Sequence, residues 1–181
     1  MPARLDRALQ VRTADRLRAS LARDQISSLP ALGALEDQVQ RDLCEVGGGR
    51  LAAVVIPVAW TLDEARNPLA IHEVETLVMR AVAGLVDEQV RRTDLLGSLR
   101  ADALLVLAPG LDPMSGQSLA QRLRDRFVHA NLEVGDVQIQ LKITVGFASR
   151  SAASPAGWTI QTLAEEAERN ISAPPPLASV A

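Results

Sequence analysis

Residues 91–109 read RRTDLLGSLRADALLVLAP, in which two short apolar segments flank a polar turn, as in a β-hairpin. Upstream, residues 51–59 (LAAVVIPVA) form a continuous apolar run, which is typical of a strand covered on both faces. Downstream, residues 137–147 (VQIQLKITVGF) alternate between polar and apolar, which predicts a half-buried antiparallel strand. Because helical segments separate these strands, the sequence predicts a mixed α/β (α+β) fold with helices packed on the sheet.

Helices are predicted wherever apolar residues recur at intervals of three and four. The predicted helices cover residues 3–23, a segment through Leu35, Val39 and Leu43 that stops at 47–49, and residues 69–90, 115–129 and 159–171. We interpret residues 1–28 as an N-terminal helical stalk that joins two chains, although the same helix could fold back on the domain. Residues 29–172 are predicted to form a single domain, and the proline-rich tail 173–181 is expected to be disordered.

Charge and composition exclude several classes of function. The formal net charge is −3 and Lys142 is the only lysine, so a broad cationic surface for a nucleic-acid polymer is not expected. Cys44 is the only cysteine and is assigned no chemistry. No apolar run approaches the roughly 20 residues that span a bilayer, and the first residues lack the apolar core of a signal peptide. We therefore expect a cytoplasmic protein without membrane insertion.

Several short motifs occur along the chain in a characteristic order, namely Asp24–Pro30 (DQISSLP), the apolar strand 51–59, His72, the hairpin 91–109 and Ile143–Ala148 (ITVGFA). In this order they resemble the GGDEF domain family, the fold of diguanylate cyclases, which condense two GTP molecules into cyclic di-GMP. The resemblance implies a palm-like, mainly antiparallel sheet flanked by helices, which agrees with the prediction made from periodicity.

The sequence departs from the family at the positions of the catalytic residues. The five signature positions are occupied by Arg100, Ala101, Asp102, Ala103 and Leu104. Arg100 and Ala101 thus replace the two glycines that let the backbone approach GTP, and Ala103 replaces a carboxylate. We expect Arg100 and Asp102 to form a solvated hairpin turn.

Further family positions are also changed. Pro57 aligns with the metal-binding aspartate of the first strand, and Thr76 aligns with an aspartate beside the guanine. Asn67 matches a guanine-contacting asparagine after a two-residue insertion, and the C-terminal lysine motif is missing near Ala173. Because two-metal phosphoryl transfer needs several oxygen ligands, we predict no catalytic residues, no metal site, no cofactor and no enzyme activity.

The start of the hairpin retains a second family motif, RxxD. Arg91 and Asp94 stand five residues before the signature positions, and Arg122, with Arg124 as a near alternative, matches a further arginine. In the family these residues form an inhibitory site that binds the product. Arginine can pair with guanine O6 and N7 or with phosphate, and aspartate can accept from guanine N–H groups. The alternative is that Arg91 and Asp94 merely pair with each other at the surface.

Two functions follow from this resemblance. The first is a catalytically inactive module that binds cyclic di-GMP through Arg91, Asp94 and Arg122 and passes the signal to an unknown protein partner, as a homodimer. The second is a ligand-free scaffold, a dimerisation or protein-interaction domain that retains only the fold.

Overall fold

The computed structural model of the protein describes residues 29–46, 49–62, 70–128, 130–134, 137–151 and 159–171. The predicted stalk 1–28, the predicted tail 173–181 and Asn67 lie outside the described residues. Within the described part of the chain, no helix is long and apolar enough to cross a lipid bilayer.

One antiparallel sheet organises the structure around its longest strand, β1 (Arg50–Leu62). On one side of β1 lies the predicted hairpin, with β3 (Ala103–Pro109) next to β1 and β2 (Leu95–Arg100) outside it. On the other side, β5 (Val137–Ile143) pairs with the C-terminal half of β1 and β6 (Gly146–Ser151) with its N-terminal half. A short strand, β4 (Asn131–Val134), follows outside β5.

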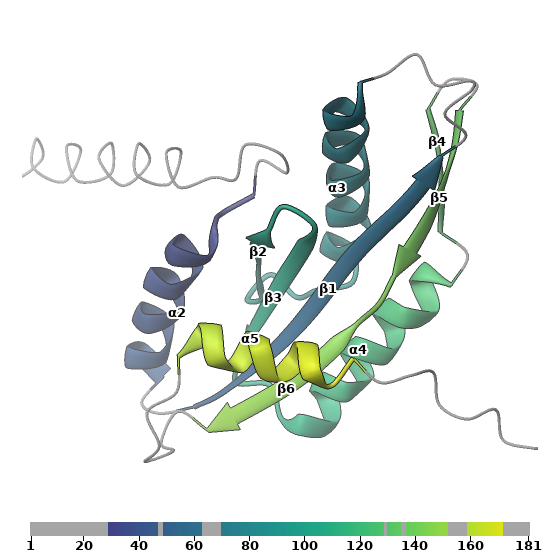
Figure 1. Ribbon diagram of the computed structural model, residues 1–181. Helices are drawn as coiled ribbons and strands as arrows, with labels where there is room; N and C mark the ends of the chain where they lie inside the picture. Colours follow the sequence, from purple (N-terminus) through teal and green to yellow (C-terminus); the bar gives the residue numbers. More distant parts are fainter. Residues whose placement is uncertain are drawn as a thin grey trace, which may run out of the picture.

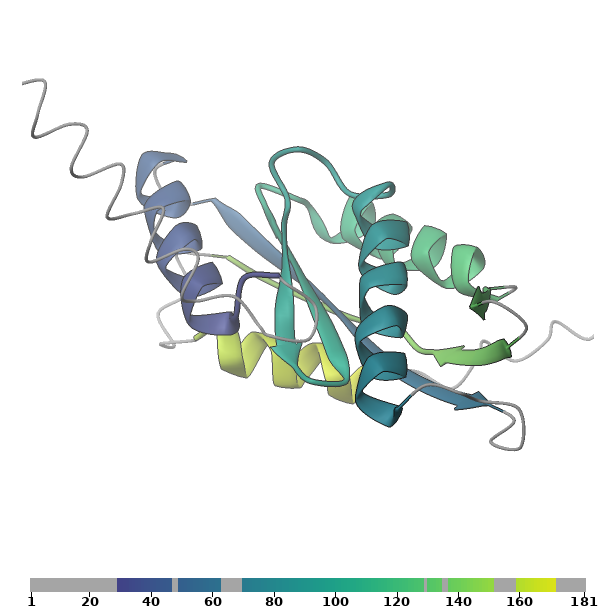
Figure 2. The ribbon, with the colours of Figure 1, turned by 90° about the horizontal axis from the view of Figure 1, so that it is seen from above.

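The helices of the described residues cover both faces of this sheet, as Figures 1 and 2 show. The helices α3 (Ile71–Asp87) and α4 (Pro113–Phe127) pack on one face, and α2 (Leu32–Val46) and α5 (Ile160–Arg169) pack on the other. Alternate residues of β1 enter the two cores, so the apolar run 51–59 is explained by cover on both faces. The predicted mixed α/β fold with an antiparallel sheet is therefore confirmed.

The prediction of one continuous strand over 137–147 is wrong, because β5 and β6 are separated at Thr144 and Val145. The register with β1 is nevertheless the same on both sides of the interruption, since Val58 lies opposite Ile143 and Val55 opposite Gly146. Thr144 therefore faces Pro57 and donates its N–H to the Pro57 carbonyl over 3.2 Å. Proline has no N–H to return the second hydrogen bond of the pair, and the ladder is interrupted there.

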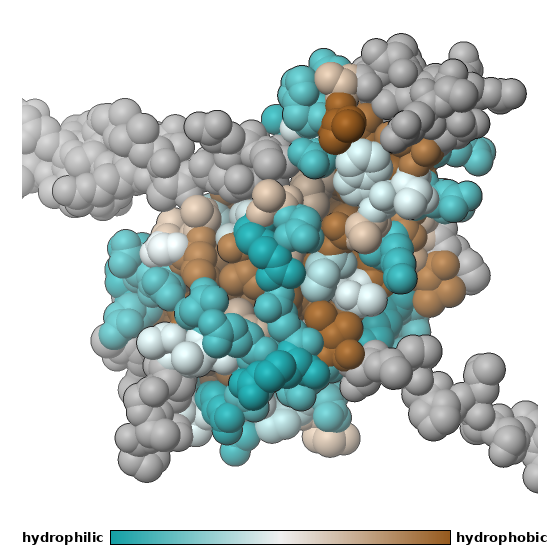
Figure 3. Space-filling view, in the orientation of Figure 1, coloured by the Kyte–Doolittle hydropathy of each residue, from teal (hydrophilic) through white to brown (hydrophobic). Residues whose placement is uncertain are grey.

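The face of the molecule seen in Figure 3 is mainly hydrophilic over its described residues, with hydrophobic side chains in several separate groups. Four large apolar side chains are exposed among the described residues, namely Ile71, Leu77, Met114 and Val128. Of these, Met114 borders a pocket described below.

Candidate functional site

The RxxD motif forms a closed turn between α3 and β2. The Asp94 N–H donates to the Arg91 carbonyl over 3.0 Å, and the Arg91 N–H donates to Asp94 Oδ2 over 2.8 Å. These two bonds hold the Asp94 carboxylate against the backbone of its own turn. The Arg91 side chain is exposed, and its guanidinium makes neither an ion pair nor a hydrogen bond to any described residue. The surface pair between Arg91 and Asp94, which the sequence left open, is therefore not formed.

The N-terminus of α4 lies beside this turn and is fixed by Asp112. Asp112 Oδ1 accepts from the N–H groups of Met114 and Ser115, both over 3.0 Å, and Oδ2 accepts from the Ser115 hydroxyl over 2.6 Å. Hydrogen bonds from Ser115, first from its hydroxyl and then from its N–H, hold the pKa of Asp112 below its ordinary value. Pro113 occupies the first helical turn, where a missing N–H costs nothing. The cap thus fixes the direction in which α4 presents its side chains.

A pocket of about 230 Å³ gathers the three predicted ligand residues, Arg91, Asp94 and Arg122. Its other lining residues are Leu111, Met114, Ser115, Ser118 and Leu119. Leu111 and Leu119 are each only 3% exposed and form an apolar floor, whereas the charged and hydroxyl groups surround it. We call this cavity the entrance pocket, because it lies at the start of the hairpin.

Arg122 and its near alternative, Arg124, point to opposite flanks of α4. Arg122 lines the entrance pocket and donates from Nη2 to the Gln89 carbonyl over 3.2 Å. Arg124 instead donates from Nε and Nη2 to the Val145 carbonyl, over 3.3 and 2.9 Å, at the break between β5 and β6. Only Arg122 is therefore placed beside Arg91 and Asp94.

Sequence reasoning missed the contribution of Ser115 and Ser118 to this pocket. Together with Arg122 they stand at intervals of three and four residues, so they share one flank of α4. That spacing was a usable signal, but only with knowledge of which flank faces the RxxD turn.

The hairpin tip is engaged with the protein itself. Arg100 Nε lies 2.8 Å from Asp102 Oδ1, and Arg100 Nη1 pairs with Glu168 Oε1 on α5. The hydrogen bond that Arg100 donates to Glu168 raises the pKa of Arg100 above its ordinary value. The expectation of a simply solvated turn is therefore wrong for Arg100, which ties the tip to α5, whereas the Asp102 side chain is 68% exposed.

The positions aligned with the family's two metal ligands are neighbours in the sheet. Pro57 of β1 lies opposite Ala103 of β3, and the adjacent Val58 N–H donates to the Asp102 carbonyl over 2.8 Å. Ala103 is fully buried. The fold thus brings the two positions together, but neither side chain carries an oxygen that could hold a cation.

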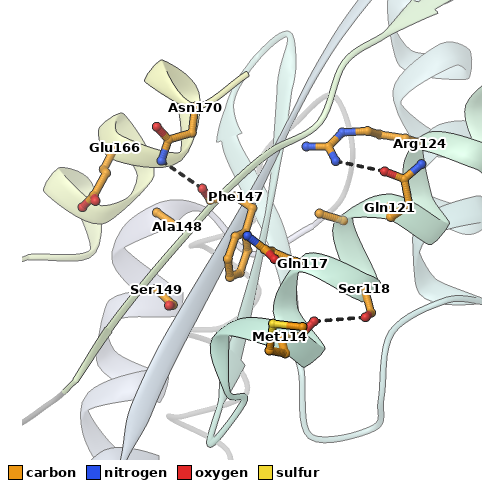
Figure 4. A pocket seen from close by; sticks show the side chains of 11 residues that line it. Met114, Gln117, Ser118, Gln121, Arg124, Phe147, Ala148, Ser149, Glu166 and Asn170 are labelled. Atoms are coloured by element: carbon orange, nitrogen blue, oxygen red, sulfur yellow. Dashed lines mark hydrogen bonds between the residues drawn. The ribbon is translucent and has the colours of Figure 1, made fainter. Parts of the chain in front are cut away.

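A second, larger groove of about 670 Å³ lies on the other flank of α4. Figure 4 shows Gln117, Gln121 and Arg124 on α4, across β6 from Glu166 on α5 and Asn170 at its C-terminal end. Among the described strands, β6 pairs with β1 alone, and residues of its outer edge line this groove. The Asn170 amide donates to the Phe147 carbonyl over 3.2 Å, and Arg124 holds the Val145 carbonyl, so side chains satisfy part of this edge.

No protein-family model matches the sequence, and no curated protein matches it. Solved structures do match its fold. The GGDEF domain of FimX from Pseudomonas aeruginosa is 18% identical with a TM-score of 0.64, over 83% of this chain and 91% of that one. The coiled coil and GGDEF domain of DgcB from Caulobacter crescentus, in complex with c-di-GMP, is 16% identical with a TM-score of 0.67, over 93% and 87%.

The diguanylate cyclase SiaD from Pseudomonas aeruginosa, in complex with its activator SiaC, is 19% identical with a TM-score of 0.66, over 93% of this chain and 65% of that one. At these identities the likeness shows the fold alone, and the chain has the fold of GGDEF domains.

Proposed function

We propose that the protein is a catalytically inactive GGDEF-like domain that binds cyclic di-GMP at the entrance pocket and acts as a regulatory module. The observation that carries this proposal is the gathering of Arg91, Asp94 and Arg122, which come from two separate segments, around one pocket. Structures of similar fold include a complex with c-di-GMP, which supports a ligand of this class.

The chemistry of the entrance pocket suits guanine. The Arg91 guanidinium, which has no partner among the described residues, can donate two parallel hydrogen bonds to O6 and N7. The Asp94 carboxylate can accept from N1–H and the N2 amino group. Arg122 has guanidinium N–H groups besides the one that donates to the Gln89 carbonyl, and these can donate to a phosphate. Adenine carries an amino group in place of O6, has no N1–H and lacks the N2 amino group, so Arg91 would keep only N7 as an acceptor and Asp94 would lose both of these donors.

Isothermal titration calorimetry of the full chain tests this proposal. We expect saturable binding of cyclic di-GMP and at least tenfold weaker binding of cyclic di-AMP, the matched control. No heat of binding with cyclic di-GMP up to about 1 mM would refute the proposal. The ligand-free scaffold would then be the better description of the domain.

The inactivity of the domain as a cyclase is proposed from residue identity. Pro57 and Ala103 face each other where two metal-binding carboxylates are expected, and Arg100 is already paired with Glu168. We expect no cyclic di-GMP from GTP with Mg²⁺ or Mn²⁺, measured by chromatography. Product that disappears in the Asp102→Ala variant would show that the domain is an enzyme after all.

We further propose that residues 1–28 hold two copies together and that the domain passes its signal to a protein partner. The apolar stripe of the predicted helix over 3–23 supports the first part. Light scattering on the full chain and on a chain that begins at Asp24 provides the test. We expect the full chain to be a dimer and the shortened one a monomer, and equal masses per particle would refute the proposed role of this segment.

A further inference from the structure

Met114 stands out on the rim of the entrance pocket. Its side chain is 74% exposed, the largest value among the four exposed large hydrophobic residues of the described chain. It borders both the entrance pocket and the larger groove on the other flank of α4, so it lies between the two flanks of this helix. Figure 4 shows Met114 next to Ser118 at the start of the helix.

Two hydrogen bonds hold the backbone of Met114, although its side chain is exposed. Its N–H donates to Asp112 Oδ1 over 3.0 Å, and its carbonyl accepts from the Ser118 hydroxyl over 3.0 Å. The thioether is therefore a flexible apolar group on a rigid support. Methionine in this setting adapts well to the surface of a ligand.

The entrance pocket has the polarity of a site for a flat ring. Its floor is formed by Leu111 and Leu119, while Arg91, Asp94 and Arg122 supply polar groups around the sides. A nucleobase has two apolar faces and a polar edge, which matches this division. A free phosphate or a ribose has no such faces and would leave the apolar floor and Met114 unused.

We propose that Met114 packs against the face of the bound base, with its sulfur and methyl group over the ring; this inference rests on the proposed function. Arg91 and Asp94 then read the edge of the base, and Met114 contributes affinity for the ring without selecting among bases. Contacts between methionine sulfur and aromatic rings are favourable enough to change affinity severalfold.

NMR of the full chain labelled with ¹³C at the methionine methyl groups tests this contact directly. The chain has only three methionines, Met1, Met79 and Met114, and Met79 is 3% exposed in the core, so it serves as an internal control. The signal of Met114, assigned with Met114→Leu, should move upfield on addition of cyclic di-GMP, because a methyl group over an aromatic ring is shielded. The Met79 signal should stay in place.

Calorimetry on variants gives the second measurement. Met114→Ala should weaken cyclic di-GMP binding about 2- to 10-fold, whereas Met114→Leu should stay within about 2-fold of the wild type. Val128→Ala is the matched control, because Val128 is also an exposed apolar residue at the end of α4 but does not line the pocket, and it should bind as the wild type does. Binding by the wild type with an unmoved Met114 signal and full affinity in Met114→Ala would overturn this inference alone. No binding by the wild type would overturn both this inference and the proposed function.

Discussion

The two ends of the β2–β3 hairpin carry the same residue types but engage them in opposite ways. At the tip, the Arg100 guanidinium is divided between Asp102 and Glu168. At the start, the Arg91 guanidinium has no partner among the described residues and borders a pocket with Asp94 and Arg122. An arginine that is already paired must break its bonds before it can bind a ligand, whereas a free one need not. The comparison therefore supports the proposal that the ligand binds at the start of the hairpin and that the tip has a structural role.

The largest expected effect is on binding at the start of the hairpin. Arg91→Ala and Asp94→Ala should each weaken cyclic di-GMP binding by about 1–3 kcal/mol, roughly five- to over a hundredfold, because each removes contacts to the edge of the base. Arg91→Lys should recover little of this loss, since an ammonium group lacks the planar fork of a guanidinium. Calorimetry measures the affinity.

Stability should not follow binding in the two Arg91 variants. Arg91 is exposed and its truncation opens no cavity, so the free energy of unfolding should change by only about half a kcal/mol. Variants that unfold early, or that bind as tightly as the wild type, would contradict the division between the two ends.

A substitution at Gly97, in strand β2 of the hairpin, should lower stability strongly without changing ligand binding. A Cβ added at Gly97 would lie 2.6 Å from the Pro30 carbonyl oxygen and would also overlap the Leu35 side chain. Gly97→Ala should therefore lower the free energy of unfolding by about 1–3 kcal/mol, measured with urea, while the remaining folded protein binds ligand normally.

Gly84→Ala is the matched control for this substitution. Gly84 lies within α3, and a Cβ there would meet nothing within 4 Å. This variant should gain about 0.5–1 kcal/mol through higher helix propensity. Equal stability of the two variants would show that the contact between β2 and the segment at Pro30 is not tight.

Much of this arrangement could be predicted from the sequence, because it depends on local pattern. The apolar run 51–59, the hairpin and the helical spacing together gave the fold class, and the RxxD spacing pointed to the residues that line the entrance pocket. The break between β5 and β6 could not be predicted from residues 137–147 themselves. Its cause, Pro57, lies on the neighbouring strand, and the pairing register was unknown.

Contacts between segments that are distant in the sequence could not be predicted either. Glu168 lies 68 residues from Arg100, and nothing local indicates that the two meet. The lining of the entrance pocket by Met114 and Ser118 depends on the rotation of α4 about its axis, which is set by how its buried face packs on the sheet. Such features follow from tertiary packing and not from spacing alone.

A smaller effect is expected at the tip. Arg100→Ala removes the ion pairs to Asp102 and Glu168, whose side chains are 68% and 29% exposed. Because partly exposed pairs are screened by water, the free energy of unfolding should fall by about 1 kcal/mol or less, and cyclic di-GMP affinity should not change. A loss of affinity comparable to that of Arg91→Ala would place the ligand at the tip and contradict the roles proposed for the two ends of the hairpin.

The smallest effect concerns Asp112, which fixes the end of α4 that borders the entrance pocket. Its pKa is lowered in the folded protein by hydrogen bonds from Ser115 and Met114, so the carboxylate stabilises the fold at pH values above its unfolded pKa. This contribution is lost as the pH falls through the lower, folded pKa, because the carboxyl group is then protonated in both the folded and the unfolded state.

Asp112→Asn keeps an oxygen that can accept from the helix N–H groups but cannot ionise. The wild type should therefore melt slightly higher than Asp112→Asn near about pH 7, and the difference should shrink steadily toward about pH 2. Thermal unfolding followed by circular dichroism at several pH values gives the comparison. A difference in melting temperature that does not depend on pH would mean that the charge of Asp112 does not stabilise the fold. The cap would then act only through its hydrogen-bond geometry.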